Sequence, residues 1–209
     1  EQVHFGDPTR GSELCTAVEM MYSLEEMLQA TADLQWADHL ERVAYNALPT
    51  QATDAYDGRQ YYQQTNQIAC SREWRNFVTQ HEDNDNVFGV LNGYPCCSCN
   101  MHQGWPKFTQ NLWYASKDGG LAAFVYAPST VTAKVADGVE VSLKQETLYP
   151  FEETVKVTVS YPSRKVKKAE FPLYFRIPEW CQNAQVQVNG ESVCDAPKAG
   201  EAVRIERVW

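Results

Sequence analysis

The chain has 209 residues, enough for one large domain or two small ones. Its 27 acidic residues outnumber its 18 basic ones, and the formal net charge of -9 argues against a nucleic-acid partner, because phosphate binding requires a basic surface. The sequence also lacks a run of about 18 apolar residues of the kind that spans a membrane, and it lacks a charged-then-apolar leader.

The first third of the chain predicts helices. Ser12 is the expected N-cap of the first, and apolar residues follow it at helical spacing, at Leu14, Ala17, Val18, Met21, Leu24 and Leu28. Glu13 and Cys15 are then expected in the first turn, where backbone N–H groups and the helix dipole favour a thiolate. Asp33 predicts the cap of a second helix, which Pro49 ends.

A loop-rich segment covers residues 50–93, and a connection of this length usually has a function or carries short elements of its own. Gly93 and Pro95 lead into a third predicted helix, from near Cys97 to about Lys117. The polar start of this helix is expected at a pocket and its aromatic body in a core.

After Gly119-Gly120 the pattern changes to short runs of β-branched and aromatic residues separated by turn residues. This pattern of short strands separated by turns predicts an antiparallel β-sandwich. The expected fold class is therefore α+β, with a helical part at 1–118 and a sandwich at 119–209. The predicted strands are Leu121 to Tyr126, Thr130 to Val135, Val139 to Leu143, Val155 to Ser160, Phe171 to Ile177, Ala184 to Val188 and Ala202 to Ile205.

Cysteines mark the most informative positions. Cys96, Cys97 and Cys99 lie within four positions, and a Glu-x-Cys pair, Glu13 and Cys15, lies far upstream. Adjacent cysteines do not readily bond to each other, because a vicinal disulfide distorts the peptide between them. Three thiols and a carboxylate suit a tetrahedral Zn²⁺ site, either structural or one that activates a nucleophilic thiolate. A reactive cysteine without metal, a thiol redox protein and ordinary buried thiols remain as alternatives.

Three further residues are candidates for substrate binding. Tyr94 and Trp105 offer aromatic faces to a sugar, and His102 follows the cysteines closely. The competing interpretation is core packing for the aromatic residues and a satisfied surface position for the histidine. Other notable groups are interpreted as structural: Glu19, Glu25 and Glu26 as a solvated helix face, Glu82, Asp83 and Asp85 as loop charges, and Cys70, Cys181 and Cys194 as small buried side chains.

Several of these segments resemble a known family. The Glu-x-Cys segment from Gly11 to Glu19 and the double-cysteine segment from Tyr94 to Met101 resemble motifs of glycoside hydrolase family 127 and its relatives. The segments Tyr45-Asn46-Ala47-Leu48 and Arg59-Gln60-Tyr61-Tyr62-Gln63-Gln64 are also similar to family segments. The resemblance covers residues 1 to about 127 well and is weak in motif beyond them.

The resemblance implies an (α/α)₆ barrel that carries the active site, followed by β-sandwich domains. This chain begins at Glu1 without a methionine and ends at Trp209 after a strand-like run, so we expect a piece of a longer protein that holds the last barrel helices and the first sandwich. Its compartment, cytoplasmic or exported, is left open.

The resemblance further implies a retaining β-L-arabinofuranosidase with a zinc-bound cysteine nucleophile and a carbohydrate substrate. Carried over by motif, Glu13, Cys15, Cys96 and Cys97 are the zinc ligands, Cys96 is the nucleophile, and Glu1 is the best match for the general acid/base. Two features depart from the pattern: the spacing from Glu1 to Glu13 is shorter than in those enzymes, and Cys99 is an additional cysteine. A non-catalytic carbohydrate-binding or structural zinc protein of the same fold is the alternative.

Overall fold

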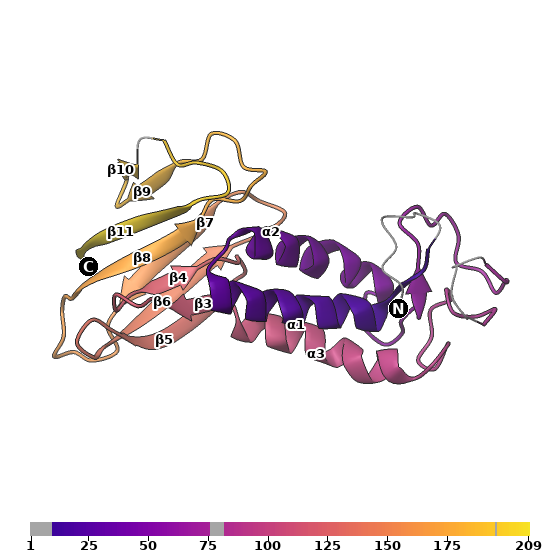
Figure 1. Ribbon diagram of the computed structural model, residues 1–209. Helices are drawn as coiled ribbons and strands as arrows, with labels where there is room; N and C mark the ends of the chain where they lie inside the picture. The colour runs from indigo at the N-terminus through magenta and orange to yellow at the C-terminus, as the bar shows by residue number, and fades with distance from the viewer. Residues whose placement is uncertain (1–9, 76–81, 195) are drawn as a thin grey trace. The chain divides into compact units, whose positions relative to one another are not determined.

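The computed structural model describes residues 10–75, 82–194 and 196–209. It combines helices in the first half of the chain with sheets in the second, so a mixed helix-and-sheet fold is confirmed (Figure 1). The chain forms two compact units. One holds the residues up to Leu24 and Leu40–Phe108, and the other holds Glu25–His39 and Thr109–Trp209.

The first helix, α1 (Leu14–Thr31), follows directly on a two-residue strand, β1 (Ser12–Glu13). Glu13 therefore lies in a strand rather than in the first helical turn, because its backbone pairs with Tyr62 of β2 (Tyr62–Gln63). The apolar residues predicted at helical spacing in α1 are all buried. Glu25 is buried as well, at 1% exposure, so its interpretation as a solvated residue is wrong; its carboxylate accepts a hydrogen bond from Asn111 at 2.9 Å.

The second helix, α2 (Gln35–Arg42), has the predicted cap, since the Asp33 carboxylate accepts a hydrogen bond from the Gln35 N–H at 3.1 Å. A π-helical turn, η1 (Val43–Ala47), and a 3₁₀ turn, η2 (Pro49–Gln51), follow it. Proline at the first position of η2 fits its fixed φ and its missing N–H.

The third helix, α3 (Cys96–Gln110), ends well before the predicted Lys117. The residues beyond it form β3 (Trp113–Ala115), whose backbone pairs with β4 (Leu121–Ala123), and this ladder satisfies the groups that a longer helix would have used. Gly104 is buried in α3, and a Cβ there would lie 2.7 Å from Leu48 Cδ2 and 3.5 Å from Val18 Cγ2. The helix thus approaches its neighbours more closely than any other residue would permit.

The described residues of the second half of the chain form three sheets. A four-stranded sheet has the order β11-β8-β4-β3, a three-stranded sheet has the order β5-β6-β7, and β9 and β10 form a ribbon. Besides β3 and β4, the strands of these sheets are β5 (Ser129–Val135), β6 (Val139–Thr147), β7 (Val155–Ser160), β8 (Glu170–Arg176), β9 (Val186–Val188), β10 (Glu191–Cys194) and β11 (Ala202–Val208).

The prediction of antiparallel pairing is wrong for one pair, because β4 and β8 run parallel. Strands β5 to β7 lie between β4 and β8 in the chain and form their own sheet, so the chain crosses over before it returns as β8. One apolar cluster joins strands of both larger sheets, at Leu121, Val135, Val141, Leu143, Phe171 and Leu173. These two sheets therefore share a core. Among the described residues, no helix has the length and apolar character needed to cross a membrane.

Candidate metal centre

Four side chains from two distant parts of the sequence meet at one point. Glu13, Cys15, Cys96 and Cys97 each offer one ligand atom, and all these atoms lie within 4.8 Å of one another. The Sγ atoms of Cys15 and Cys97 are 3.4 Å apart. Glu13 Oε1 lies 3.4 Å from Cys96 Sγ and 3.7 Å from Cys97 Sγ. The structure thus brings together the four residues that the sequence suggested as metal ligands.

Local structure explains how Glu13 and Cys15 reach this point. Glu13 ends a strand, and the next residue, Leu14, starts α1 while its N–H still donates to the Tyr61 carbonyl at 3.2 Å. The buried Gln51 side chain donates to the Ser12 carbonyl at 2.9 Å and holds the strand from the other side. The switch from strand to helix therefore occurs between the two ligands and is anchored on both sides.

Cys96 and Cys97 open α3. The first hydrogen bonds of this helix run from the N–H groups of Ser98 and Cys99 to the Pro95 carbonyl, at 3.0 and 3.3 Å. The N–H groups of Cys96 and Cys97 come before these bonds, where a helix offers no carbonyl of its own, so this end carries a partial positive charge. That charge favours anionic ligands at both cysteines.

The separations fit a zinc ion. With Zn–S bonds of about 2.3 Å and Zn–O bonds of about 2.0–2.2 Å, a tetrahedron has edges of about 3.5–3.8 Å. Three of the six ligand-atom separations measure 3.4, 3.4 and 3.7 Å, close to those edges, and the other three are at most 4.8 Å. Three thiols and one carboxylate are also a donor set that suits zinc.

The electrostatics of the protein alone disfavour thiolates here. Burial raises the pKa of Cys97 to about 12, although contacts with Cys15 lower it. Burial also raises the pKa of Cys15, against a hydrogen bond with Asn100 that lowers it. Without a cation the two thiols are therefore protonated at neutral pH, and a metal ion would supply the charge that stabilises them as thiolates.

One neighbour of this cluster has no role in the sequence-based interpretation. The pKa of Tyr61 is raised by burial first and then by its electrostatic interactions with Glu13 and Cys96, and Tyr61 also shares a hydrogen bond with Cys96. Its phenol therefore stays protonated and can donate to the sulfur. Tyr61 stands in a segment that resembles the family, but nothing in its spacing indicates a contact with residues so far along the chain.

The predicted substrate-binding residues do not join the four-residue cluster. Tyr94 is 69% exposed, and His102 is exposed on α3. Trp105 is half-buried and packs against Tyr45 and Phe108, with ring centroids 6.3 and 5.7 Å away, as the core-packing interpretation expects. Glu1, the candidate acid/base, lies outside the described residues.

The remaining cysteines are not part of the cluster. Cys99 is exposed, and Cys181 and Cys194 are half-buried. Cys70 is exposed, so its interpretation as a buried side chain is wrong; it lies in the loop-rich segment, where the side chains of Gln60 and Gln67 donate to its sulfur at 3.0 and 3.1 Å.

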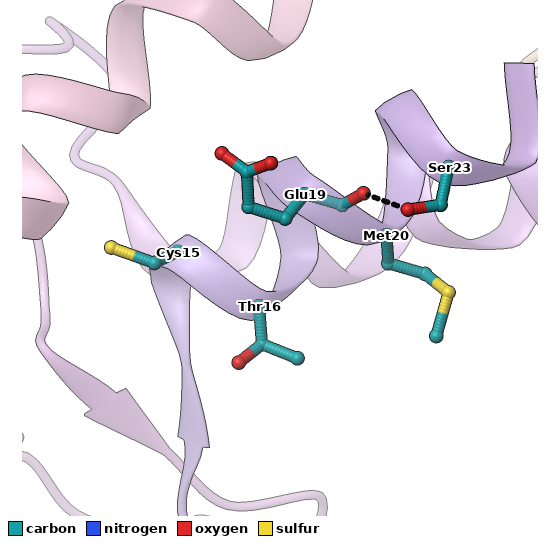
Figure 2. A pocket seen from close by; sticks show the side chains of 5 residues that line it. All are labelled: Cys15, Thr16, Glu19, Met20 and Ser23. Carbon is teal, nitrogen blue, oxygen red and sulfur yellow. Dashed lines mark hydrogen bonds between the residues drawn. The ribbon is translucent and has the colours of Figure 1, made fainter. Parts of the chain in front are cut away.

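A shallow, open groove of about 320 Å³ begins at Cys15 and follows one face of α1 (Figure 2). Its lining is Cys15, Thr16, Glu19, Met20 and Ser23. Figure 2 shows the Cys15 sulfur pointing away from the helix axis, and the Ser23 hydroxyl donates to the Glu19 carbonyl at 2.8 Å. One metal-ligand candidate is thus reachable from an open surface.

Three known proteins resemble this chain in sequence or in fold. A curated relative, the non-reducing end beta-L-arabinofuranosidase of Bifidobacterium longum subsp. longum, is 28% identical over 189 residues, which are 88% of this chain and 27% of the relative. A solved glycoside hydrolase superposes with a TM-score of 0.74 at 26% identity, covering 95% of this chain and 31% of its own. A solved GH127 beta-arabinofuranosidase gives a TM-score of 0.71 at 20% identity, over 94% and 30% of the two chains, and shows likeness of fold. The chain therefore spans less than a third of the length of these relatives.

Family models cover most of the sequence. Residues 2–110 match the GH127 catalytic domain of beta-L-arabinofuranosidase, and residues 120–209 match the GH127 middle domain. The chain belongs to glycoside hydrolase family 127.

Proposed function

We propose that this chain supplies part of the active site of a retaining glycosidase that releases terminal β-L-arabinofuranose from plant-type glycans. The observation that carries the proposal is the convergence of Glu13, Cys15, Cys96 and Cys97, with all ligand atoms within 4.8 Å, in the segment that matches the family's catalytic domain. The curated relative with a non-reducing end arabinofuranosidase name supports the choice of sugar.

In this proposal Glu13, Cys15, Cys96 and Cys97 hold one zinc ion, and Cys96 is also the nucleophile. Burial supports the division of labour between the adjacent cysteines: Cys97 is fully buried, whereas Cys96 is only half-buried and so remains open to a substrate. When bound, zinc lowers the thiol pKa and supplies a thiolate near neutral pH.

The reaction has two displacements, as retention requires. In the first, the Cys96 sulfur bonds to the anomeric carbon, the bond from that carbon to the leaving oxygen breaks, and a carboxylic acid protonates that oxygen. In the second, the same group, now a carboxylate, takes a proton from water, the water oxygen bonds to the anomeric carbon, and the carbon–sulfur bond breaks. Glu1 is proposed as this acid/base. The Tyr61 phenol donates to the Cys96 sulfur and orients it.

A second function is favoured by one feature of the same site. Four protein ligands close a tetrahedral zinc site, and closed sites of this kind are usually structural. The alternative is therefore a non-catalytic carbohydrate-binding or structural zinc protein. In either case we propose that α1 to α3 belong to an (α/α)₆ barrel, with the helical part at 1–118 and a β-sandwich at 119–209.

A sugar-directed label tests the nucleophile in the full-length protein. An arabinofuranose analogue that carries a haloacetamide at its anomeric position should alkylate Cys96 alone, and peptide mass spectrometry should locate the adduct there. Free arabinose should protect Cys96, and the Cys99→Ser variant, which removes an exposed thiol outside the cluster, should label as the parent protein does. An adduct on Cys97 or Cys99, or normal turnover by Cys96→Ser, contradicts the assignment.

A further inference from the structure

Among the described residues, the two largest fully buried side chains are those of Arg59 and Arg176, and 1% of Arg59 is exposed. The Arg59 backbone is paired with two other segments. Arg59 N–H donates to the Gly89 carbonyl at 3.1 Å and Gly89 N–H donates back at 3.0 Å, and a β-bridge joins Arg59 to Ala52. Burying a guanidinium costs free energy unless its N–H groups are hydrogen-bonded, so the residues that accept these bonds indicate the role of Arg59.

Three hydrogen bonds of this guanidinium reach the segment that leads into α3, and its Cζ atom lies 5.8 Å from the centroid of the Tyr61 ring. Nε donates to the Ser98 hydroxyl at 3.1 Å, and Nη2 donates to the Tyr94 carbonyl at 3.1 Å. Nη1 donates to the Asn92 carbonyl. The planar fork of arginine therefore spans residues 92–98 and brackets Cys96 and Cys97 from both sides in sequence.

The bracketed segment has little regular structure before the helix. Gly93 has φ +64°, and a Cβ there would lie 2.6 Å from Asp85 Oδ1 and 2.7 Å from the Tyr61 side chain. The Ser98 hydroxyl, which accepts from Arg59, donates in turn to the Val90 carbonyl. The guanidinium thus links the carbonyls of Asn92 and Tyr94, which precede the helix, to the Ser98 side chain in its first turn.

We propose that Arg59 is a positioning residue that fixes the N-terminal turn of α3, so that Cys96 and Cys97 are held ready for a metal ion. The inference rests on the metal role given above for these cysteines. The role requires the shape of the fork as well as its charge, because the single ammonium group of lysine cannot reach three acceptors spread over seven residues.

The test uses the full-length protein with Arg59→Lys and Arg59→Met. Zinc affinity is measured by competition with a chromophoric chelator, and the Co²⁺-loaded protein is examined by absorption spectroscopy, which reports thiolate ligation and tetrahedral geometry. Both variants should bind zinc about 10- to 100-fold more weakly and show altered cobalt bands. The double variant Arg176→Met with Asp38→Leu is the matched control, because Arg176 is as buried as Arg59, donates to Asp38 and to the Phe124 carbonyl, and the double change leaves no unpaired buried charge. It should keep the parent cobalt spectrum.

Ser98→Ala covers the case in which an Arg59 variant does not fold. It removes the Nε acceptor together with the Ser98 bond to the Val90 carbonyl, and it should weaken zinc binding in the same direction by a smaller factor. The inference is wrong if Arg59→Lys binds zinc as tightly as the parent protein and has an unchanged cobalt spectrum. If the arginine variants do not fold, the same result in Ser98→Ala overturns it. Either result leaves the metal site itself in place. A parent protein that binds no zinc overturns the proposed function itself.

Discussion

Arg176 of β8 forms a buried ion pair with Asp38 of α2, although 138 positions separate them in the sequence. The Asp38 carboxylate also accepts a hydrogen bond from the Glu179 N–H at 3.0 Å, and Arg176 Nε donates to the Phe124 carbonyl at 2.6 Å. Both side chains belong to the same compact unit and are at most 6% exposed. The pair therefore ties a helical residue to the four-stranded sheet.

Removing one partner should be costly. In Asp38→Ala the buried guanidinium keeps its charge without a counterion, and we expect a loss of about 3–5 kcal/mol in the free energy of unfolding. Urea denaturation followed by circular dichroism measures this loss. The double variant Asp38→Leu with Arg176→Met buries no charge and should recover most of it. Equal destabilisation in the single and double variants would show that packing, not charge, dominates at this position.

Gly104 should not tolerate a larger side chain. Gly104→Val pushes a branched Cβ into the buried Leu48 side chain and should destabilise the protein by about 2–3 kcal/mol, even though glycine itself is unfavourable in a helix. Gln110→Val, at an exposed position of the same helix, is the control and should change stability by about 0.5 kcal/mol or less. Thermal unfolding of both variants decides the matter, and a stabilised Gly104→Val would refute the close approach of the helices.

Zinc binding should release protons. Because burial raises the pKa of Cys97 to about 12 and also raises that of Cys15, these thiols are protonated in the metal-free protein at pH 7 and must lose their protons to become ligands. Apparent zinc affinity should therefore rise between pH 6 and 8, by about tenfold per pH unit for each proton released. Competition titrations at several pH values measure the slope. An affinity that does not change with pH would mean that the thiols are already ionised or are not ligands.

The two adjacent cysteines should respond differently to substitution. Cys97→Ser removes a fully buried ligand, so the full-length protein should lose zinc and regain part of its activity when zinc is added in excess. Cys96→Ser should remain inactive at any zinc concentration, because the proposed nucleophile is gone. Zinc content by elemental analysis and hydrolysis of an aryl arabinofuranoside are measured together. If added zinc restored the activity of Cys96→Ser, Cys96 would be the residue that only holds the metal, and Cys97 would be the candidate nucleophile.

The candidate metal ligands could be named from the sequence because residue type and local motif carried the information. Glu-x-Cys and the double cysteine are rare combinations, and each also resembles a family motif. Tyr61 and Arg59 could not be assigned in this way, since a common tyrosine and a lone arginine acquire their contacts only when residues 85–98 fold over them.

Elements were predictable where the pattern was long. The buried face of α1 and the strand β7 follow directly from apolar spacing. Short elements were missed: β3 was assigned to the end of α3, and β10 was overlooked although Asn189-Gly190, both with positive φ, form a typical hairpin turn before it. The parallel β4–β8 pair is a property of the chain crossover, which no local pattern encodes.

A metal ion at this centre would act as a reversible cross-link between distant parts of the chain. Cys15 and Cys97 are 82 positions apart, so an ion shared between them closes a loop that includes the whole irregular segment between η2 and α3. An ion that binds the folded chain and not the unfolded one stabilises the fold by mass action, by about 4 kcal/mol when free metal exceeds the dissociation constant about a thousandfold. Unlike a disulfide, this closure depends on the supply of metal rather than on an oxidising compartment. Metal supply would then set the lifetime of the folded chain as well as the chemistry at Cys96.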